Sequence, residues 1–530
     1  MSDPTPESLA EAIASFLADH PEALVLEDGL PLFDLRTARY SLTLAHGRCL
    51  LQFWSDERNL VRTVTAIQPR SGLLRLTTRR MGSSKPGSLD LVLQRDRRTA
   101  STRESQRRQY QRLLERVLQQ HFPHATPDGF RSAADLEHSF GPAFTRGQLL
   151  FAGSPAHAVI AIGSQESRAA IDGILTVGLL WLHHCRHHAV GRSARHRHYG
   201  ALRVIVPHGM AQTTARRMRW LHPDLAAWHL HSLDEATGQL LPVDLDANLE
   251  LTLPHAFDPA LLLERVQPAI QRILSLLPAP AHAAVELRPQ SPTELHLQLH
   301  GLPFASIRLA ASQHSFHHQQ EITFGAGVHA TPLTPENESF CRSLFHALAA
   351  ARHPAGNLRH PLFRLRTEGW IESRIRAALP DLFPSLDPRF LYSQLPALAA
   401  AHRDILDLLT VDHSGRLVIL EIKAAEDLDF PLQGLDYWMR VQAMLAAPGH
   451  SGNLFQANGY FPGIPLSPLP PRLLLIAPSL RIHPANEILL RSLHPQVDWE
   501  LIALGEDWRT SLQTVFRKRS HYSGVTLQGN

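Results

Sequence analysis

The segment that most constrains the fold is residues 404–423, DILDLLTVDHSGRLVILEIK. Two apolar runs flank Asp-His-Ser-Gly, which is typical of a tight turn, so this segment is predicted to form a β-hairpin. Strand alternation with a period of two puts Glu421 and Lys423 on one face, while Leu420 and Ile422 face the core. The chain must therefore build a sheet that carries charged side chains at the end of an apolar strand.

Asp407 lies near the start of the first strand of this hairpin. Antiparallel pairing counted from the turn puts it opposite residue 420 or 421, so two carboxylates and the Lys423 ammonium converge. Such a cluster is costly at the end of apolar strands unless something binds there. Carboxylate oxygens at this spacing suit Mg²⁺, with Mn²⁺ as the expected substitute.

A divalent metal in this cluster predicts hydrolysis of a phosphodiester bond. Asp407 and Glu421 would hold the metal, which would polarise the phosphodiester and lower the pKa of a water molecule. Lys423 would orient or help to deprotonate that water, or stabilise the charge that builds on the phosphate. The residues leave these roles of the lysine open.

The order of Asp, hairpin, Glu-x-Lys and a following helix with Gln resembles the PD-(D/E)xK nuclease superfamily. This group includes type II restriction enzymes, archaeal Holliday-junction resolvases and mismatch endonucleases of the NucS kind, and DLLTVDHSGRLVILEIK is especially similar to the last. The resemblance covers residues 360–510 and does not explain the first 350. It implies a restriction-endonuclease-like mixed sheet flanked by helices, and a magnesium-dependent nuclease that acts on nucleic acid, with DNA favoured over RNA.

The resemblance also assigns roles to residues on two helices. The family's helix glutamate maps onto Glu372 in EGWIESRIRAAL, as an extra metal ligand or water holder, and Glu368, one turn earlier, is the less favoured substitute. The residue on the helix after Glu-x-Lys maps onto Gln433. The implied catalytic set is Asp407, Glu421, Lys423, Glu372 and Gln433, and the implied metal ligands are Asp407, Glu421 and Glu372.

Two segments, one beginning at Leu202 and one at Leu473, follow the same plan of strand, Pro, helix, Leu-His-Pro, Trp and strand. The matched landmarks keep offsets of 271 or 272 residues: Pro207 and Pro478, His222 and His494, Trp228 and Trp499. We interpret this as a duplicated α/β unit. Chance similarity between two strand–helix–strand units is the alternative.

The first copy of this repeat departs from the nuclease pattern. In place of Asp407, Glu421 and Lys423 we expect Gln148, then Ala161 or Ile162, then Gly163 or Ser164. A copy without the metal ligands would be a pseudo-nuclease that keeps the shape and a basic surface. Its expected role is to grip nucleic acid or to form an interface.

The complete chain is predicted to be a multidomain protein of mixed α/β class. We expect a β-rich module at 1–100, an α/β domain with the degenerate copy at 101–250, a mixed module and linker at 251–355, and the nuclease-like domain at 356–530. The resemblance allows for a homodimer, since nucleases of this class often pair to cut both strands.

Charge is distributed unevenly along the chain. Residues 51–220 contain 26 Lys and Arg against 11 Asp and Glu, a net charge of +15, whereas the whole chain carries +3. Such a block is the electrostatic footprint of a protein with a polyanionic partner. The alternatives are a solvated surface with scattered arginines, or a codon bias toward arginine.

Other sequence features restrict the compartment and the function. No apolar run reaches the roughly 20 residues needed to cross a bilayer, and the N-terminus has no basic region followed by an apolar core. We therefore expect a cytoplasmic protein without a membrane partner, acting in repair, recombination or defence. Two rivals remain: a non-catalytic DNA-binding scaffold, and a sensor nuclease gated by a small effector.

Overall fold

The computed structural model divides the chain into two compact units, Met1–Gln106 and Arg107–Asn530. The structure describes residues 5–27, 30–35, 38–45, 47–54, 59–70, 73–79, 86–92, 98–133, 140–188, 197–246, 249, 251, 253–311, 318–326, 330–396, 405–449 and 452–520. Several sheets with flanking helices confirm the predicted mixed α/β class and multidomain organisation. The described helices include none that is long and apolar enough to cross a bilayer.

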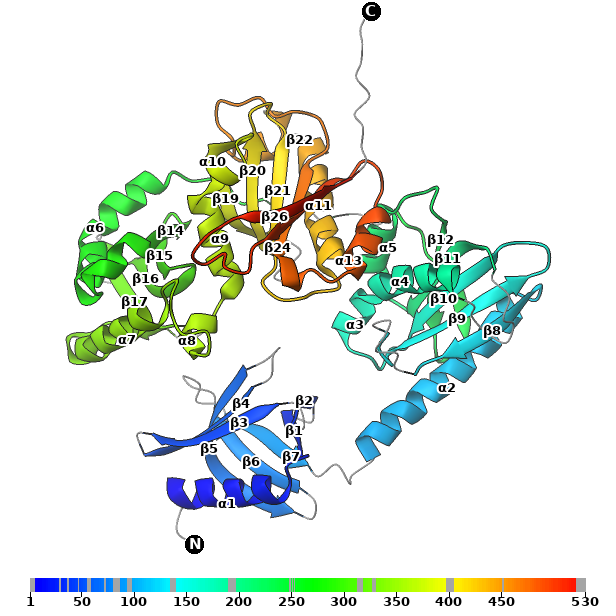
Figure 1. Ribbon diagram of the computed structural model, residues 1–530, viewed down its shortest axis with the longest axis horizontal. Helices are drawn as coiled ribbons and strands as arrows, with labels where there is room; N and C mark the ends of the chain where they lie inside the picture. Colours follow the sequence, from blue (N-terminus) through cyan, green and yellow to red (C-terminus); the bar gives the residue numbers. More distant parts are fainter. Residues whose placement is uncertain are drawn as a thin grey trace, which may run out of the picture. The chain divides into compact units, whose positions relative to one another are not determined.

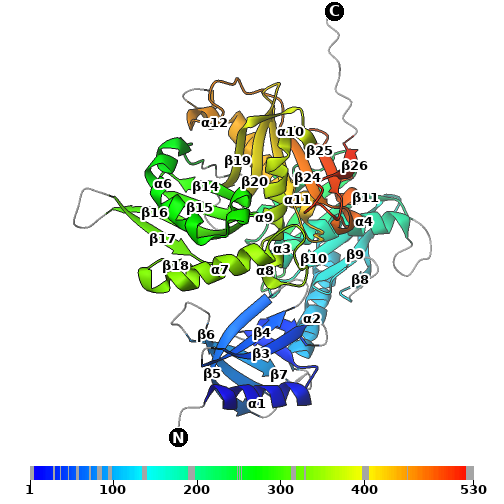
Figure 2. The same ribbon diagram turned by 60° about the vertical axis from the view of Figure 1, so that its left-hand side comes forward.

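The first unit is an antiparallel seven-stranded sheet with a helix across one face (Figure 2). The helix α1, Pro6–Asp19, is capped by the Thr5 hydroxyl and buries Leu9, Ile13 and Leu17 at a spacing of four residues against the sheet. The strands run in the order β2-β1-β7-β6-β5-β4-β3. Their bounds are β1 Leu24–Glu27, β2 Leu30–Asp34, β3 Arg39–Ala45, β4 Arg48–Trp54, β5 Asn59–Arg70, β6 Leu73–Arg79 and β7 Pro86–Val92.

The second unit begins with a six-stranded mixed sheet, which we call the first copy together with its helices. Its strands are β8 Ala125–Arg131, β9 Phe144–Phe151, β10 Ala156–Ile162, β11 Tyr199–Pro207, β12 Ala227–Asp234 and β13 Gln239–Pro242. The helices are α2 Arg98–His121, α3 Arg168–Asp172, α4 Ile174–His187 and α5 Gln212–Met218. The central strands β10, β11 and β12 are parallel, β9 and β13 are antiparallel to them, and β8 is antiparallel to β9.

A middle module of antiparallel strands follows. Its strands are β14 Val285–Ser291, β15 Glu294–Leu299, β16 Leu302–Ala311, β17 His318–Phe324 and β18 Thr331–Pro332. Two helices, α6 Pro259–Leu276 and α7 Glu338–Ala351, bury their apolar stripes against this sheet. This packing gives the module its own hydrophobic core.

The last sheet and its helices form the second copy. Its strands are β19 Leu386–Pro396, β20 Ile405–Asp412, β21 Leu417–Ile422, β24 Arg472–Pro478, β25 Asp498–Leu504 and β26 Thr514–Arg519. The predicted hairpin of β20 and β21 is present, and its turn residue Gly415 has a φ of +83°. The helices are α8 Pro361–Arg364, α9 Thr367–Ala377, α10 Leu379–Leu382, α11 Phe430–Ala446, α12 Leu454–Ala457 and α13 Ala485–Arg491, and the short pair β22 Pro448–Gly449 and β23 Gly452–Asn453 lies after α11.

The two copies share one topology. The orders β8-β9-β10-β11-β12-β13 and β19-β20-β21-β24-β25-β26 carry the same sequence of antiparallel and parallel pairings. The long helix packs closely on the sheet through a glycine in each copy. A Cβ on Gly178 would lie 2.9 Å from Ile160, and one on Gly434 would lie 2.7 Å from Leu475. The predicted duplication is therefore present in strand order and direction.

The two copies pack on each other through α4, α5, α11 and α13 (Figure 1), and equivalent residues meet across this interface. Leu221 forms a β-bridge with Leu493, its counterpart in the repeat. The His222 amide donates to the Ser492 carbonyl, and the His494 amide donates to the Trp220 carbonyl, both at 2.8 Å. The helix contacts are reciprocal as well, because α4 packs on α13 while α11 packs on α5. Such self-complementary contacts are those of a twofold dimer, here made within one chain.

Candidate active site

The hairpin places Asp407 opposite Glu421. Leu408 pairs with Leu420, so the next pair along the ladder joins residues 407 and 421 and selects one of the two predicted registers. The Asp407 Oδ2 atom accepts a hydrogen bond of 2.9 Å from the Ile422 amide. Two carboxylates thus lie on adjacent strands at the carboxyl end of β21.

Glu421 is the most deeply buried member of this cluster. Its side chain is 2% exposed, and its Oε1 atom lies 3.3 Å from the Lys423 Nζ atom. Its Oε2 atom is buried without a hydrogen-bond partner. A buried, unpaired carboxylate oxygen is costly, so Glu421 is built for a partner other than Lys423 alone.

One expectation about the strand was incomplete. Leu420 and Ile422 do face the core formed with α9, but Leu417 and Ile419 are equally buried against the side covered by α11. The sheet is covered on both faces, which is usual where a parallel pair such as β21 and β24 lies at its centre. Glu421 therefore lies beneath α11 and not on a solvated face.

The surroundings shift the pKa values of Asp407, Glu421 and Lys423. Burial raises the pKa of Asp407 to about 6, and burial together with Asp407 raises the pKa of Glu421 well above its usual value. Burial opposes the charge of Lys423, but Glu421, Glu368 and Asp407 outweigh burial and raise its pKa. Lys423 therefore stays protonated, whereas Asp407 and Glu421 resist ionisation. Additional positive charge near the two carboxylates would favour their ionised form.

The helix α9 brings two glutamates toward the cluster. Glu368 accepts a hydrogen bond of 3.5 Å from the Ala424 amide, and its charge acts on Asp407, Glu421 and Lys423 alike. Glu372 lies further along the helix, 3.9 Å from Arg288 of β14, and burial raises its pKa to about 7 with a smaller contribution from Asp407. The glutamate predicted as the substitute thus faces the Glu421–Lys423 pair more directly than the one predicted as the ligand.

Gln433 supports the site from α11. Its Nε2 atom donates a hydrogen bond of 3.0 Å to the Asp427 Oδ2 atom, and Asp427 in turn raises the pKa of Lys423. Gln433 therefore acts through Asp427 in this structure. In the sequence, Asp427 is marked only by its place in an acidic turn, residues 426–429, that follows Glu-x-Lys.

Asp429 of the same turn contacts the first copy and not the carboxylate cluster. Its carboxylate accepts hydrogen bonds from the Thr176 hydroxyl and from Arg217, both in the first copy. Arg217 also donates to Asp436 at 2.8 Å, and the guanidinium is almost fully buried. These contacts join the two copies, so Asp429 belongs to their interface.

Asp407 and Glu421 could supply two of the ligands of a divalent cation. Among the described residues, no three His, Cys, Asp or Glu side chains stand together as a ready metal-binding group. Glu372 lies 3.9 Å from Arg288 of β14, and Asp407 contributes to its raised pKa. Two carboxylates with one unpaired oxygen still fit Mg²⁺, which usually takes one or two protein carboxylates together with water and substrate oxygens.

The strand register identifies the equivalent positions in the first copy. Val204 and Leu475 each lie three residues before the matched prolines, and they pair with Ile160 and Glu421 respectively. Ile160 also pairs with Arg146, which takes the place of Asp407. Counting two residues further puts Ile162 in place of Lys423. The expected residues Gln148, Ala161 and Gly163 were therefore wrong, because small shifts in loop length cannot be counted from sequence.

Arg146 is fully buried at this place. Its guanidinium lies 4.8 Å from the centre of the Phe140 ring and donates to the Ala133 carbonyl at 2.7 Å. An aromatic face and a carbonyl thus hold a cation where the second copy has a carboxylate. At these positions the first copy has no counterpart of the carboxylate pair Asp407 and Glu421.

No protein-family model matches this chain, and no curated protein sequence matches it.

Proposed function

We propose that this protein is a metal-dependent nuclease that hydrolyses phosphodiester bonds of nucleic acid, with DNA favoured as substrate. The observation that carries the proposal is the buried Glu421 carboxylate, with one unpaired oxygen, opposite Asp407 and 3.3 Å from Lys423. The resemblance to the PD-(D/E)xK superfamily supports the same activity. Repair, recombination and defence are the biological settings that such an activity would serve.

Asp407 and Glu421 would hold a divalent cation, Mg²⁺ or Mn²⁺. When bound, this cation would neutralise the two carboxylates and polarise the phosphodiester. Lys423, whose pKa the carboxylates raise, would remain protonated and face the phosphoryl oxygens as negative charge builds on them. Asp427, fixed by Gln433, would keep the ammonium in place.

Hydrolysis also needs a group that takes a proton from water. Glu372 suits this step at neutral pH, because burial raises its pKa to about 7. Glu368 lies closer to Lys423 and would orient the water through its second oxygen while Oε1 accepts from the Ala424 amide. The water oxygen would bond to phosphorus, the bridging P–O bond would break, and the departing oxygen would take a proton from solvent.

The rival proposal is a binding scaffold that keeps the fold without cutting. The first copy favours this alternative in one respect, because it maintains the same topology with Ile160 and Arg146 in place of the carboxylates. The two proposals differ in what Lys423 should do.

The deciding experiment compares the wild-type chain with Lys423→Ala on labelled DNA and RNA substrates, with Mg²⁺, Mn²⁺ or EDTA. Lys518→Ala is the matched control, since this lysine is half-exposed and pairs with Glu487. We expect metal-dependent cutting by the wild type and by the control, and a loss of roughly a hundredfold or more in Lys423→Ala while binding survives. Binding without cutting by all three proteins would favour the scaffold.

A further inference from the structure

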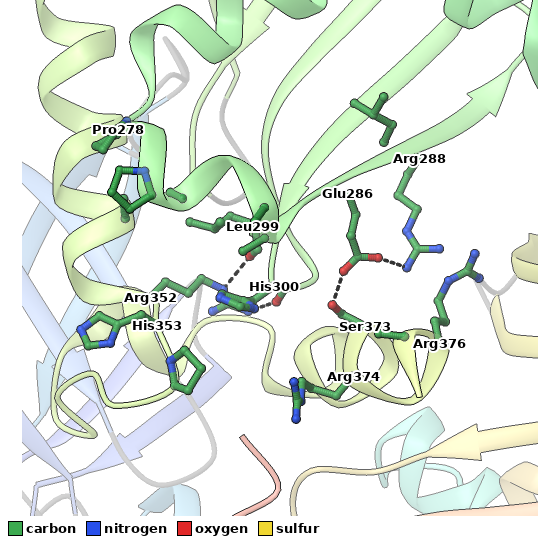
Figure 3. A pocket seen from close by; sticks show the side chains of 18 of the residues that line it. Pro278, Glu286, Arg288, Leu299, His300, Arg352, His353, Ser373, Arg374 and Arg376 are labelled. Carbon is green, nitrogen blue, oxygen red and sulfur yellow. Dashed lines mark hydrogen bonds and ion pairs between the residues drawn. The ribbon is translucent and has the colours of Figure 1, made fainter. Parts of the chain in front are cut away.

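A cleft of about 1250 Å³ lies between α9 and the middle module (Figure 3). Its walls come from the last turns of α9, from β14, from the end of α7 and from residues 388–391 of β19. Pockets for small ligands usually enclose about 300–1,000 Å³. This cleft is larger, so it has room for an extended ligand.

The lining of the cleft is strongly basic. Of its residues within the described chain, Glu286 is the only acidic one, whereas five are arginines: Arg288, Arg352, Arg374, Arg376 and Arg389. None of these described lining residues is Phe, Tyr or Trp. Because aromatic rings are the usual platforms for nucleobases, the lining favours recognition of phosphate over recognition of bases.

The arginines of the cleft differ in what they already bind. Arg352 is buried and donates to several backbone carbonyls, which makes it a structural residue. Arg374 points away from the others and reaches the Thr510 carbonyl at 3.4 Å. Arg288 and Arg376 instead converge from β14 and α9, as Figure 3 shows, and burial together with Arg288 lowers the pKa of Arg376.

The neighbouring carboxylates leave part of the hydrogen-bonding capacity of Arg288 and Arg376 unused. Glu286 accepts from Arg288 at 2.5 Å and from the Ser373 hydroxyl, so its oxygens are committed. Glu372 lies 3.9 Å from Arg288, and burial lowers its tendency to ionise. The Arg376 Nη1 atom is buried with no hydrogen-bond partner. A buried guanidinium nitrogen without a partner indicates a site that an anion completes.

We propose that this cleft binds the sugar-phosphate backbone of the substrate strand beside the cleavage site, with Arg288 and Arg376 on one phosphate and Arg389 at the mouth. Glu368, Glu372 and Arg376 follow one face of α9 at intervals of four residues, so Arg376 lies roughly 12 Å from Glu368 along the helix. That length corresponds to about three to four nucleotides of duplex. The inference depends on the proposed function only for the identity of the substrate.

The test measures binding without cutting. The full chain carrying Lys423→Ala is titrated in EDTA with labelled single-stranded and duplex oligonucleotides at several salt concentrations. We expect Arg376→Ala and Arg389→Ala each to weaken binding about tenfold and to reduce the slope of log affinity against log salt by about 0.7 for single strands or about 0.9 for duplex. Arg376→Lys should retain the slope, and Arg265→Ala, exposed on α6 outside the cleft, should change neither quantity.

The outcomes separate this inference from the proposed function. Unchanged slopes in both Arg376→Ala and Arg389→Ala would overturn the cleft as a backbone site, even if the wild type cuts. Displacement of the oligonucleotide by micromolar AMP or ATP would also overturn it, in favour of a free-nucleotide site. Reduced slopes with no cutting by the wild type in Mg²⁺ or Mn²⁺ would support the cleft and refute the nuclease. Arg389 is largely exposed and pairs with Asp387, which keeps its hydrogen bond from the backbone amide of residue 389 in the variant, so the variant is expected to fold.

Discussion

The two copies of the repeated sheet show what this fold requires for stability and what it carries for function. Both copies have the same strand order, the same glycine beneath the long helix and reciprocal contacts across a pseudo-twofold axis. At the central positions, however, the first copy has Ile160 and Arg146, and the second has Glu421 and Asp407. Because apolar packing and a ring-stacked arginine maintain the sheet in the first copy, the buried carboxylates of the second are not needed for the fold.

The largest expected effect is on activity in the second copy. Glu421→Gln should reduce cutting by roughly a thousandfold, because it removes a metal-binding charge, and should leave the melting temperature unchanged or higher, because it removes a buried charge. Cleavage rates and thermal unfolding test both parts, with Glu487→Gln, a partly exposed glutamate of α13 paired with Arg491 and Lys518, as control for the cleavage rate. Unimpaired cutting by Glu421→Gln would show that the two copies are functionally alike.

The reciprocal change in the first copy should act on stability. Ile160→Glu places a carboxylate in the buried core beneath α4, opposite Arg146 of β9, and should lower the free energy of unfolding by about 3 kcal/mol or more. Ile160→Val, which removes one methylene group, should cost about 1 kcal/mol. Denaturant unfolding measures both, and a Glu variant as stable as the Val variant would mean that this position tolerates charge after all.

A third difference concerns the number of strands cut. In the proposed nuclease the first copy would supply no second cutting centre, because Ile160 and Arg146 stand where the second copy has Glu421 and Asp407. Supercoiled plasmid should yield nicked circles over linear product by at least about tenfold early in the reaction. Linear product formed at the same rate would indicate two active centres, as in a homodimer of this chain.

The smallest expected effect is the pH dependence that the buried carboxylate Asp407 gives to the second copy. In its folded state the pKa of Asp407 is raised to about 6 by burial, above the value of an unfolded chain. Such an acid binds protons more tightly when folded, so its contribution to stability is present at low pH and lost as pH rises through about 6.

The free energy of unfolding, measured in EDTA at several pH values, tests whether stability falls as pH rises. Wild type should gain about 1 kcal/mol relative to Asp407→Asn as pH falls from 7.5 to 5. Cutting in Mg²⁺ should fall over the same range, since protons compete with the cation for the carboxylates. A stability difference that does not change with pH would contradict the burial of this charge.

Sequence patterns were sufficient for the local features of the second copy. The turn chemistry of Asp-His-Ser-Gly and the apolar runs beside it predict the hairpin, and Glu421 and Lys423 follow from its alternation. Constant offsets between matched prolines, histidines and tryptophans predict the repeat. These features depend on residues within a few positions of one another, or on identity at fixed spacing, and both are visible in one dimension.

Only the tertiary structure decided which distant groups meet. It brought Glu368 nearer than Glu372 to Lys423, put Arg146 in the place of Asp407, and set Arg288 from another module against α9. Such pairings depend on loop lengths, on the rotation of each helix on its sheet and on packing between modules, which no local periodicity records. The sequence by itself determined the chemistry available to this protein, and the tertiary packing determined which of those groups can act together.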